Sequence, residues 1–226
     1  MFRLRGVERN YLLGAGLLSG LCLALFGLRV LITGSSRYYF IPINLTLAWL
    51  ALIFGWLLVL QLKRTGWLNW KALVLGILWL IFLPNCWYVL TDFLHVGANG
   101  EISQLYDITL MTTLVVSGFL LGFTSLYLVH RELRQELSAR LSNWLVAFII
   151  LLASFGIYLG RDLRWNTWDV LKNPGGVLIN ISDRVAEPLG HPRAINITGL
   201  FFVLIGILYL VIWLFLGPSA YRHRRR

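Results

Sequence analysis

Six stretches of about 20 apolar residues, each nearly free of charge, constrain this chain more than any other feature. An apolar helix of that length crosses the hydrocarbon core of a bilayer, and helices satisfy their own backbone hydrogen bonds there. Only 13% of the residues are charged, about half the share in a soluble domain. The sequence predicts an all-α, polytopic membrane helix bundle, a single domain over residues 1–226. Its spans are expected at residues 11–33, 43–62, 72–90, 105–129, 144–160 and 195–216.

Charge is distributed unequally between the two sides that these spans define. With the N-terminus inside, the inner segments hold 13 basic and three acidic residues, whereas the outer segments hold seven of each. The positive-inside rule therefore predicts that both termini are cytoplasmic. The basic C-terminal tail is interpreted as a topology anchor near anionic headgroups, with no nucleic-acid partner expected. The one long connection, residues 161–194, is expected on the outer side, where its middle could lie in the membrane interface.

Polar side chains gather at the outer end of the third span. At 100° per residue, Asn85, Tyr88, Asp92 and His95 fall within an arc of about 80° on one helix face. Asp92 is expected at the outer interface, about 31 Å along the helix from the inner surface. Pro84 precedes this face and predicts a kink that frees a backbone carbonyl one turn earlier.

The fifth span ends in a second polar group. If its helix continues to Asp169, the side chains of Arg161, Trp165 and Trp168 share a stripe, with Arg164 beside it. Other spans also carry polar residues near their outer ends. Arg29 closes the first span, Asn44 opens the second, and Asp107 opens the fourth.

Three interpretations of this outer layer stay open. The residues could satisfy one another, with Asp92 or Asp107 paired to Arg161 or Arg164. They could bind a ligand, because two arginines flanked by tryptophans suit a phosphate, a carboxylate or a lipid headgroup. The third interpretation is a metal site on Asp92, His95 and Asp107, although no second histidine lies nearby and the candidate ligands are few. No cofactor is indicated.

Smaller features favour structural roles. Three Gly-x-x-x-Gly pairs, at residues 16/20, 118/122 and 156/160, predict close helix packing, more within the chain than between copies. Cys22 and Cys86 lie inside apolar runs and are expected to be buried or lipid-facing, without a disulfide framework. The histidines at 130, 191 and 223 are expected at the surface.

Two dense motifs resemble a known family. Residues 83–95, LPNCWYVLTDFLH, and residues 158–169, YLGRDLRWNTWD, are similar to the family called domain of unknown function 1361, bacterial multi-pass membrane proteins. The resemblance implies a bacterial inner-membrane protein and assigns no activity. The family pattern often has a second proline at the position of Trp87 and an aromatic residue at the position of Asp162. Asp162 therefore adds an acid beside Arg161 that could neutralise it.

The sequence supports three hypotheses of function for a multi-pass protein of the inner membrane. In the first, the outer ends bind an anionic lipid or small anionic ligand, through residues drawn from Asn85, Tyr88, Arg161, Arg164, Trp165, Trp168 and Asp169. In the second, a membrane-embedded enzyme uses Asp92 or His95 as general base and Asp107 as partner carboxylate, on a lipid-linked or periplasmic substrate. In the third, the layer only locks a structural or assembly subunit. Charges confined to one end argue against an ion pathway across the bilayer.

Overall fold

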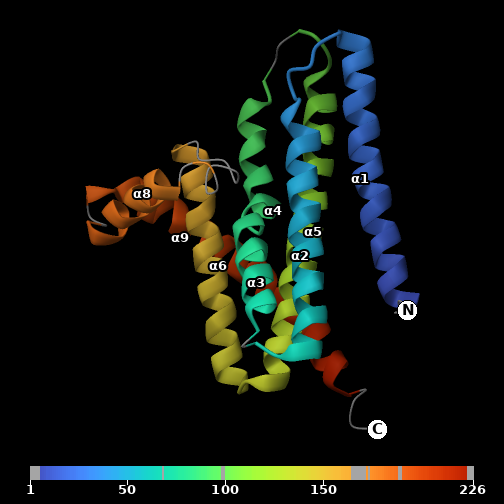
Figure 1. The fold of residues 1–226 in the computed structure, drawn as a ribbon. Helices are drawn as coiled ribbons and strands as arrows, with labels where there is room; N and C mark the ends of the chain where they lie inside the picture. The colour runs from blue at the N-terminus through green and yellow to red at the C-terminus, as the bar shows by residue number, and fades with distance from the viewer. Residues whose placement is uncertain are drawn as a thin grey trace.

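A computed structural model describes residues 6–67, 69–97, 100–163, 172, 174–187 and 190–222 of the chain. Every regular element in these residues is helical, as the sequence predicted (Figure 1). In chain order the elements are α1 (Gly6–Thr33), α2 (Phe40–Thr65), α3 (Trp70–Phe82), α4 (Asn85–Tyr88), the 3₁₀ helix η1 (Val89–His95), α5 (Gln104–Glu136), α6 (Ala139–Asp162), α8 (Pro174–Ala186) and α9 (Pro192–Arg222).

Six helical segments in the described residues are long and apolar enough to cross a membrane, which confirms a multi-pass bundle. The shortest have 24 residues, about 36 Å of helix, which exceeds a hydrocarbon core of about 30 Å. Five expected spans match single helices: α1, α2, α5, α6 and α9. The third is a composite that runs from Trp70 to His95 through α3, α4 and η1.

The composite span bends at Pro84, as expected from a residue without a backbone N–H. α3 ends at Phe82, and the Cys86 amide turns back to the Leu83 carbonyl instead of the Phe82 carbonyl. The freed Phe82 carbonyl accepts a hydrogen bond of 3.0 Å from the side-chain amide of Asn85. The side chain therefore replaces the backbone donor that the kink removes.

Beyond the kink, the geometry differs from the straight α-helix that the sequence analysis assumed. From Val89 to His95 the chain is a 3₁₀ helix, which turns about 120° per residue instead of 100°. Asp92 and His95 therefore align along one edge, while Tyr88 lies about 120° away around the axis. The expected arc of about 80° is wrong, and Asp92 is turned into the bundle, where it is 2% exposed.

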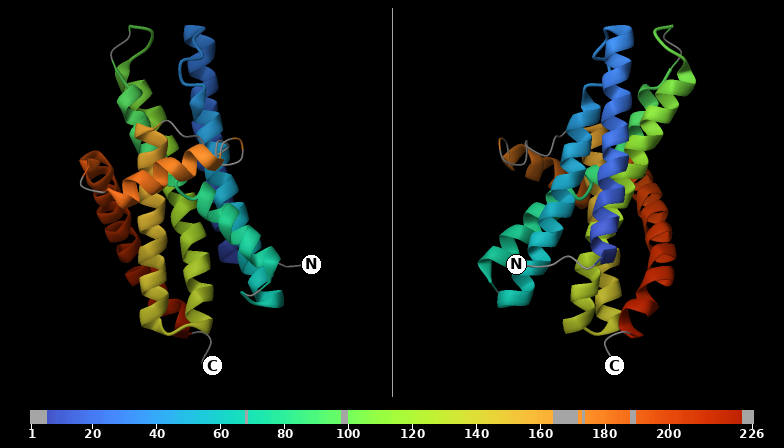
Figure 2. Two further views of the ribbon diagram at one scale, coloured as in Figure 1. Left: turned by 60° about the vertical axis from the view of Figure 1, so that its left-hand side comes forward. Right: turned by 90° about the vertical axis from the view of Figure 1, so that its right-hand side faces the viewer.

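Helix α2 lies at the centre of the packing, between α3 and α5, and α1 lies along α5 (Figures 1 and 2). α4 packs against α5 and α2, and α6 joins the remaining helix α9 to the bundle. α8, from the long connection, lies across the side of α6 and not along the bundle (Figure 2). This places the last turns of α1 and η1 and the first turns of α2 and α5 together at one end (Figure 1). The sequence analysis expected this end on the outer side, so it is called the outer end below, and the opposite end is called the inner end.

Two of the Gly-x-x-x-Gly pairs place a glycine where helices approach closely within the chain. A Cβ built on Gly118 would lie 2.5 Å from the carbonyl oxygen of Cys86, and one on Gly122 would lie 2.6 Å from the Cys86 Cβ. A Cβ on Gly156 would lie 2.7 Å from the Pro84 ring. The prediction of intrachain packing is confirmed at these glycines. They seat the kinked segment between α5 and α6.

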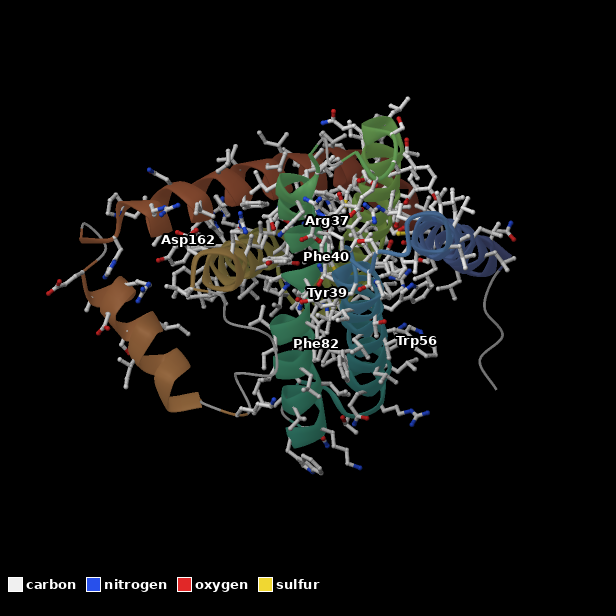
Figure 3. The ribbon with its side chains drawn as sticks, turned by 90° about the horizontal axis from the view of Figure 1, so that it is seen from above. Arg37, Tyr39, Phe40, Trp56, Phe82 and Asp162 are labelled. Atoms are coloured by element: carbon white, nitrogen blue, oxygen red, sulfur yellow. The ribbon has the colours of Figure 1, made fainter. Side chains whose placement is uncertain are left out.

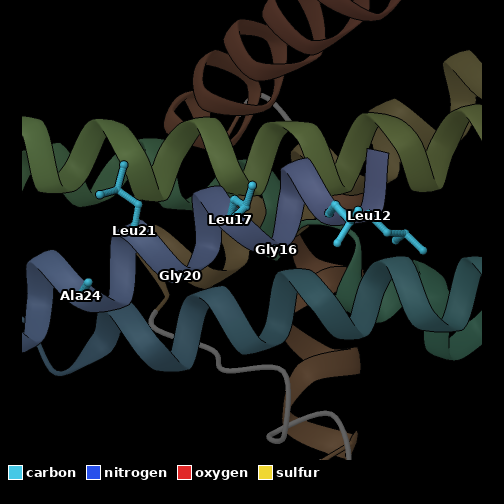
Figure 4. Close-up of a pocket in the computed structure, with 7 residues that line it drawn as sticks. Leu12, Gly16, Leu17, Gly20, Leu21 and Ala24 are labelled. Carbon is cyan, nitrogen blue, oxygen red and sulfur yellow. The ribbon is translucent and has the colours of Figure 1, made fainter. Parts of the chain in front are cut away.

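The pair at Gly16 and Gly20 behaves differently. A Cβ built on either residue meets no atom within 4 Å among the described residues. A shallow hollow of about 470 Å³ follows this face of α1 and is lined by leucines, the two glycines and Ala24 (Figure 4). Its lining is apolar, so it offers no chemistry to the polar layer.

Candidate functional site

The polar residues at the outer end form two groups, not one layer. The Arg29 cluster consists of Arg29, Tyr38, Glu101 and Asp107. Arg29 lies in α1, Asp107 in α5, Tyr38 in the α1–α2 connection and Glu101 in the η1–α5 connection. The Asp92 cluster consists of Asn44, Tyr88, Asp92 and Arg161, from α2, α4, η1 and α6. The two differ in how completely their charges are satisfied.

The Arg29 cluster surrounds a guanidinium that is wholly buried. Its Nε donates to Asp107 Oδ1 at 2.8 Å, and its Nη2 donates to Glu101 Oε2 at 2.8 Å. The guanidinium carbon lies 4.4 Å from the centre of the Tyr38 ring, within cation–π range. The Tyr38 hydroxyl donates to Asp107 Oδ2 at 2.9 Å. Three protein groups therefore hold one arginine.

Tyr38 lies in the connection before α2 and serves as a donor in this cluster. Burial raises the pKa of its phenol, and the hydrogen bond to the Asp107 carboxylate raises that pKa further. The phenol therefore keeps its proton at neutral pH and can donate to Asp107. Of the Arg29 guanidinium, only Nη1 is buried without a hydrogen-bond partner in the described part of the chain.

Asp107 is thus bound to Arg29, and not to Arg161 or Arg164 as the ion-pair interpretation expected. The acid is fully buried and accepts from both Arg29 and Tyr38. This arrangement neutralises the carboxylate and places it at the α1–α5 contact. It leaves Asp107 poorly suited as the free partner carboxylate of an enzyme.

In the Asp92 cluster, the only hydrogen-bond donor to the carboxyl group among the described residues is neutral. Asn44 Nδ2 donates to Asp92 Oδ2 at 2.8 Å, from the first turns of α2. The ion pairs formed among the described residues do not include Asp92. A carboxylate has room for about four hydrogen bonds, so this one keeps capacity to accept more.

Arg161, on the last turn of α6, is half-buried and lies within electrostatic range of Asp92 and Tyr88. It makes no ion pair or hydrogen bond with any residue that the structure describes. Its sequence neighbour Asp162 pairs with Arg193 of α9 at 3.3 Å instead. Figure 3, a view down the bundle, shows Asp162 on the side of α6 that faces α9. The acid beside Arg161 is therefore directed to another cation.

The other expected residues of the third span have distinct surroundings. Asn85 and Tyr88 are half-buried, and Asn85 caps the freed Phe82 carbonyl. His95 is exposed, and its ring centre lies 5.1 Å from that of Phe40. Its Nδ1 lies 3.3 Å from the Asp92 backbone carbonyl oxygen, not from the carboxylate. Figure 3 shows Phe40 beside Arg37 near the middle of this end.

The far end of the fifth span is the part of the prediction that the structure describes least. α6 ends at Asp162, and Leu163 follows as its C-cap. Arg164, Trp165, Trp168 and Asp169 lie outside the described residues. After them, α8 is tied to α6 by Arg184, whose Nε donates to the Tyr158 hydroxyl at 3.0 Å.

No three His, Cys, Asp or Glu side chains in the described ranges gather closely enough to hold a metal ion. Asp92, His95 and Asp107 do not converge, because Asp107 faces Arg29 while the His95 ring lies on Phe40. Cys22 and Cys86 are both free and buried, as expected. Metal coordination therefore finds no support in the geometry of these residues.

Sequence reasoning missed two sets of residues. Tyr38 and Glu101 complete the Arg29 cluster but lie in connections, where no periodic pattern marks them. His130 was expected at the surface, yet it is 3% exposed near the inner end. Its Nδ1 lies 2.9 Å from the Tyr209 hydroxyl, and its ring stacks on Trp213 at 3.9 Å.

The expectation for His130 is wrong because α9 covers this face of α5 with aromatic rings. Tyr209 and Trp213 are four residues apart, hence on one face of α9. That spacing is the signal that could have predicted a partner face for His130. Of the other two histidines, His191 is half-exposed and His223 lies outside the described residues.

Comparison with known proteins is consistent with the two sequence motifs. No curated protein and no solved structure matches the chain. One family model does match, over residues 43–220, and its description is a protein of unknown function, DUF1361. That range runs from the first turn of α2 to the last turn of α9 and includes the whole Asp92 cluster, but it begins after Arg29 and Tyr38. The chain therefore belongs to the DUF1361 family of proteins of unknown function.

Proposed function

We propose that this protein binds the anionic group of a lipid or small ligand at the outer end of its helix bundle, through Arg161. The observation that carries this proposal is that Arg161 is half-buried and its side chain makes no ion pair or hydrogen bond with the described part of the chain. Burying an arginine without a partner is costly, and a phosphate or carboxylate offers the two acceptors that its planar donor edge matches. The Arg161 guanidinium is therefore available to bind a phosphate or carboxylate group.

The depth of the site suits a headgroup. Arg161 lies about 31 Å along α6 from Arg140, which we expect at the inner surface. Asp92 lies about 33 Å from Lys71 along the composite third span, allowing for the longer rise of a 3₁₀ helix. Both distances slightly exceed the hydrocarbon thickness of about 30 Å, so both groups are expected at the outer headgroup level.

A structural role is the second candidate, and the Arg29 cluster favours it. There the guanidinium is surrounded by two carboxylates and a phenol ring, which is the arrangement of a lock between helices. The enzyme hypothesis has less support, because Asp107 is engaged by Arg29 and Tyr38. We therefore place ligand binding at the Asp92 cluster and structural locking at the Arg29 cluster.

The proposal includes an orientation. The inner segments carry the excess positive charge, so we place both termini in the cytoplasm and the Asp92 cluster on the periplasmic side of a bacterial inner membrane. With charged groups concentrated near the ends of the spans, a receptor or accessory role fits better than a transport pathway.

Thermal unfolding in detergent tests the proposal. The unfolding midpoint of the purified protein is measured with increasing phosphatidylglycerol and, separately, with inorganic phosphate. A ligand that binds the folded state raises its stability, by about 2.7 kcal/mol at 100 times its Kd. We expect a rise that Arg161→Gln abolishes and Arg37→Gln retains, because Arg37 is an exposed arginine at the same end and does not hold Asp162. Equal rises in the wild type and Arg161→Gln would contradict the proposal.

A further inference from the structure

The Asp92 cluster contains a carboxyl group and a guanidinium that do not form an ion pair with each other. Asp92 and Arg161 interact electrostatically, yet no ion pair forms between them. Among the described residues, the Asp92 carboxyl group accepts one hydrogen bond, from the neutral Asn44 amide, and Asp162 pairs with Arg193. A cation and a carboxyl group thus stand near each other, each with bonding capacity left over.

The proximity of Asp92 and Arg161 limits the kinds of ligand that the site can bind. A simple anion bound to Arg161 would meet the Asp92 carboxylate, and like charges repel strongly where water is excluded. A simple cation bound to Asp92 would meet Arg161 for the same reason. A ligand that carries a positive and a negative group a few ångströms apart satisfies both residues and leaves no net charge in the site.

We propose that the ligand is zwitterionic and contains a primary ammonium beside a phosphate, the chemistry of a phosphoethanolamine group. This inference rests on the proposed binding of an anionic group at Arg161 and names the class of ligand. The guanidinium would hold the phosphate through two parallel hydrogen bonds. The ammonium would donate to the Asp92 carboxylate, which retains acceptor capacity beside its bond from Asn44.

The burial of Asp92 selects the form of the positive group. The side chain is only 2% exposed, so a compact ammonium with its own N–H donors can replace the lost water contacts. A trimethylated ammonium is larger and has no N–H to donate. The site should therefore prefer phosphoethanolamine to phosphocholine, and both the lipid headgroup and free phosphoethanolamine carry the required chemistry.

A headgroup series measured on the full-length protein in detergent tests this inference. Affinities are determined for short-chain phosphatidylethanolamine, phosphatidylcholine and phosphatidylglycerol, and for free phosphoethanolamine. We expect wild-type protein to bind phosphatidylethanolamine about tenfold more tightly than either other lipid, the factor that one charge-assisted hydrogen bond of about 1.4 kcal/mol supplies. Free phosphoethanolamine binding as tightly as the lipid would assign a soluble ligand. Weaker binding of the free compound would assign the lipid.

Two variants separate the parts of the argument. Asp92→Asn keeps the size of the side chain and removes its charge, so the preference for phosphatidylethanolamine should disappear while phosphatidylglycerol binds equally or more tightly. Arg161→Gln should weaken the binding of every ligand, and the control Arg37→Gln, at an exposed arginine of the same end, should weaken none.

The outcomes distinguish this inference from the proposal on which it rests. If wild-type protein binds phosphatidylglycerol at least as tightly as phosphatidylethanolamine, the zwitterionic ligand is wrong. If it binds phosphatidylcholine at least as tightly, the primary ammonium is wrong. Either result overturns the phosphoethanolamine assignment, independently of the variants. If binding still depends on Arg161, the proposed anion site at Arg161 remains supported. Binding that is independent of Arg161 would overturn both. The wild-type series needs no variant to fold, so the test does not depend on the stability of Asp92→Asn.

Discussion

Asp107 and Asp92 are both buried carboxyl groups at the outer end, yet their neighbours give them different roles. Asp107 receives hydrogen bonds from a buried guanidinium and a phenol, so its negative charge is compensated by its immediate neighbours. Among the described residues, Asp92 receives one hydrogen bond, from a neutral amide, and Arg161 forms no ion pair with it. A fully compensated carboxylate stabilises packing, whereas a partly compensated one next to an unpaired arginine can respond to a ligand.

Asp107→Ala tests the structural role of the Arg29 cluster. The change leaves a wholly buried guanidinium with Glu101 as its remaining carboxylate, so we expect a loss of about 3 kcal/mol in the free energy of unfolding. The check is thermal or denaturant unfolding in detergent. Arg193→Ala, which breaks an ion pair with an 82% exposed arginine, is the control and should cost less than about 1 kcal/mol. Equal stability of Asp107→Ala and wild type would exclude the lock.

Ser125→Ala tests a buried polar chain in the centre of the bundle. The Trp79 indole N–H donates to Ser125 Oγ at 2.6 Å, and Ser125 donates to the Ala51 carbonyl at 3.0 Å. Removing the hydroxyl leaves the indole N–H without its acceptor, which should destabilise the protein by about 1–3 kcal/mol. Thr46→Ala, at an exposed hydroxyl bonded to its own helix, is the matched control. A smaller effect at Ser125 than at Thr46 would refute this account.

At the scale of elements, the kinked third span determines which residues meet. Pro84 ends α3, Asn85 caps the freed carbonyl, and the 3₁₀ turn from Val89 directs Asp92 inward towards Asn44. A continuous α-helix would have placed Asp92 and Tyr88 on neighbouring lines instead. Close approach of this segment to α5 and α6 requires glycines on those helices.

Alanine substitution at glycines tests that packing. Gly118→Ala and Gly122→Ala place a methyl group 2.5–2.6 Å from atoms of Cys86, so each should destabilise the protein by about 1–3 kcal/mol. Gly16→Ala and Gly20→Ala meet nothing within 4 Å among the described residues and should leave the stability unchanged or slightly raised. Unfolding midpoints of the four variants decide this. The packing argument fails if the two pairs respond alike.

At the scale of the whole molecule, the proposed function depends on orientation. The connection between α1 and α2 lies at the same end as the Arg29 cluster, and the α2–α3 connection lies at the opposite end (Figure 1). The exposed residues Ser36 and Thr65 mark these two ends, and both native cysteines are buried.

Cysteine labelling in intact cells therefore reports the orientation. With the positive charge inside, Ser36→Cys should react with a membrane-impermeant maleimide, and Thr65→Cys should react only after permeabilisation. Wild-type protein, whose own cysteines are both buried, gives the background. The reverse labelling pattern would place the Asp92 cluster in the cytoplasm.

The sequence predicted the six spans and the kink because apolar length and proline chemistry act locally. It could not predict that Asp107 pairs with Arg29, because that contact joins helices 78 residues apart in sequence. Tyr38 and Glu101 lie in connections without periodicity, and the burial of His130 depends on the distant α9. The 3₁₀ turn at Val89–His95 also escaped prediction, because an α-helical spacing of 100° per residue was applied throughout.

The central claim is that Arg161 holds an anionic group, and native mass spectrometry of the purified protein tests it most directly. Wild type, Arg161→Gln and the control Arg37→Gln are purified identically in mild detergent, and the masses of their bound species are measured. The account predicts a phosphate-containing or carboxylate-containing adduct on wild type and on Arg37→Gln, which Arg161→Gln loses while remaining folded. The same adducts on all three proteins, or none on a folded wild type, would contradict it.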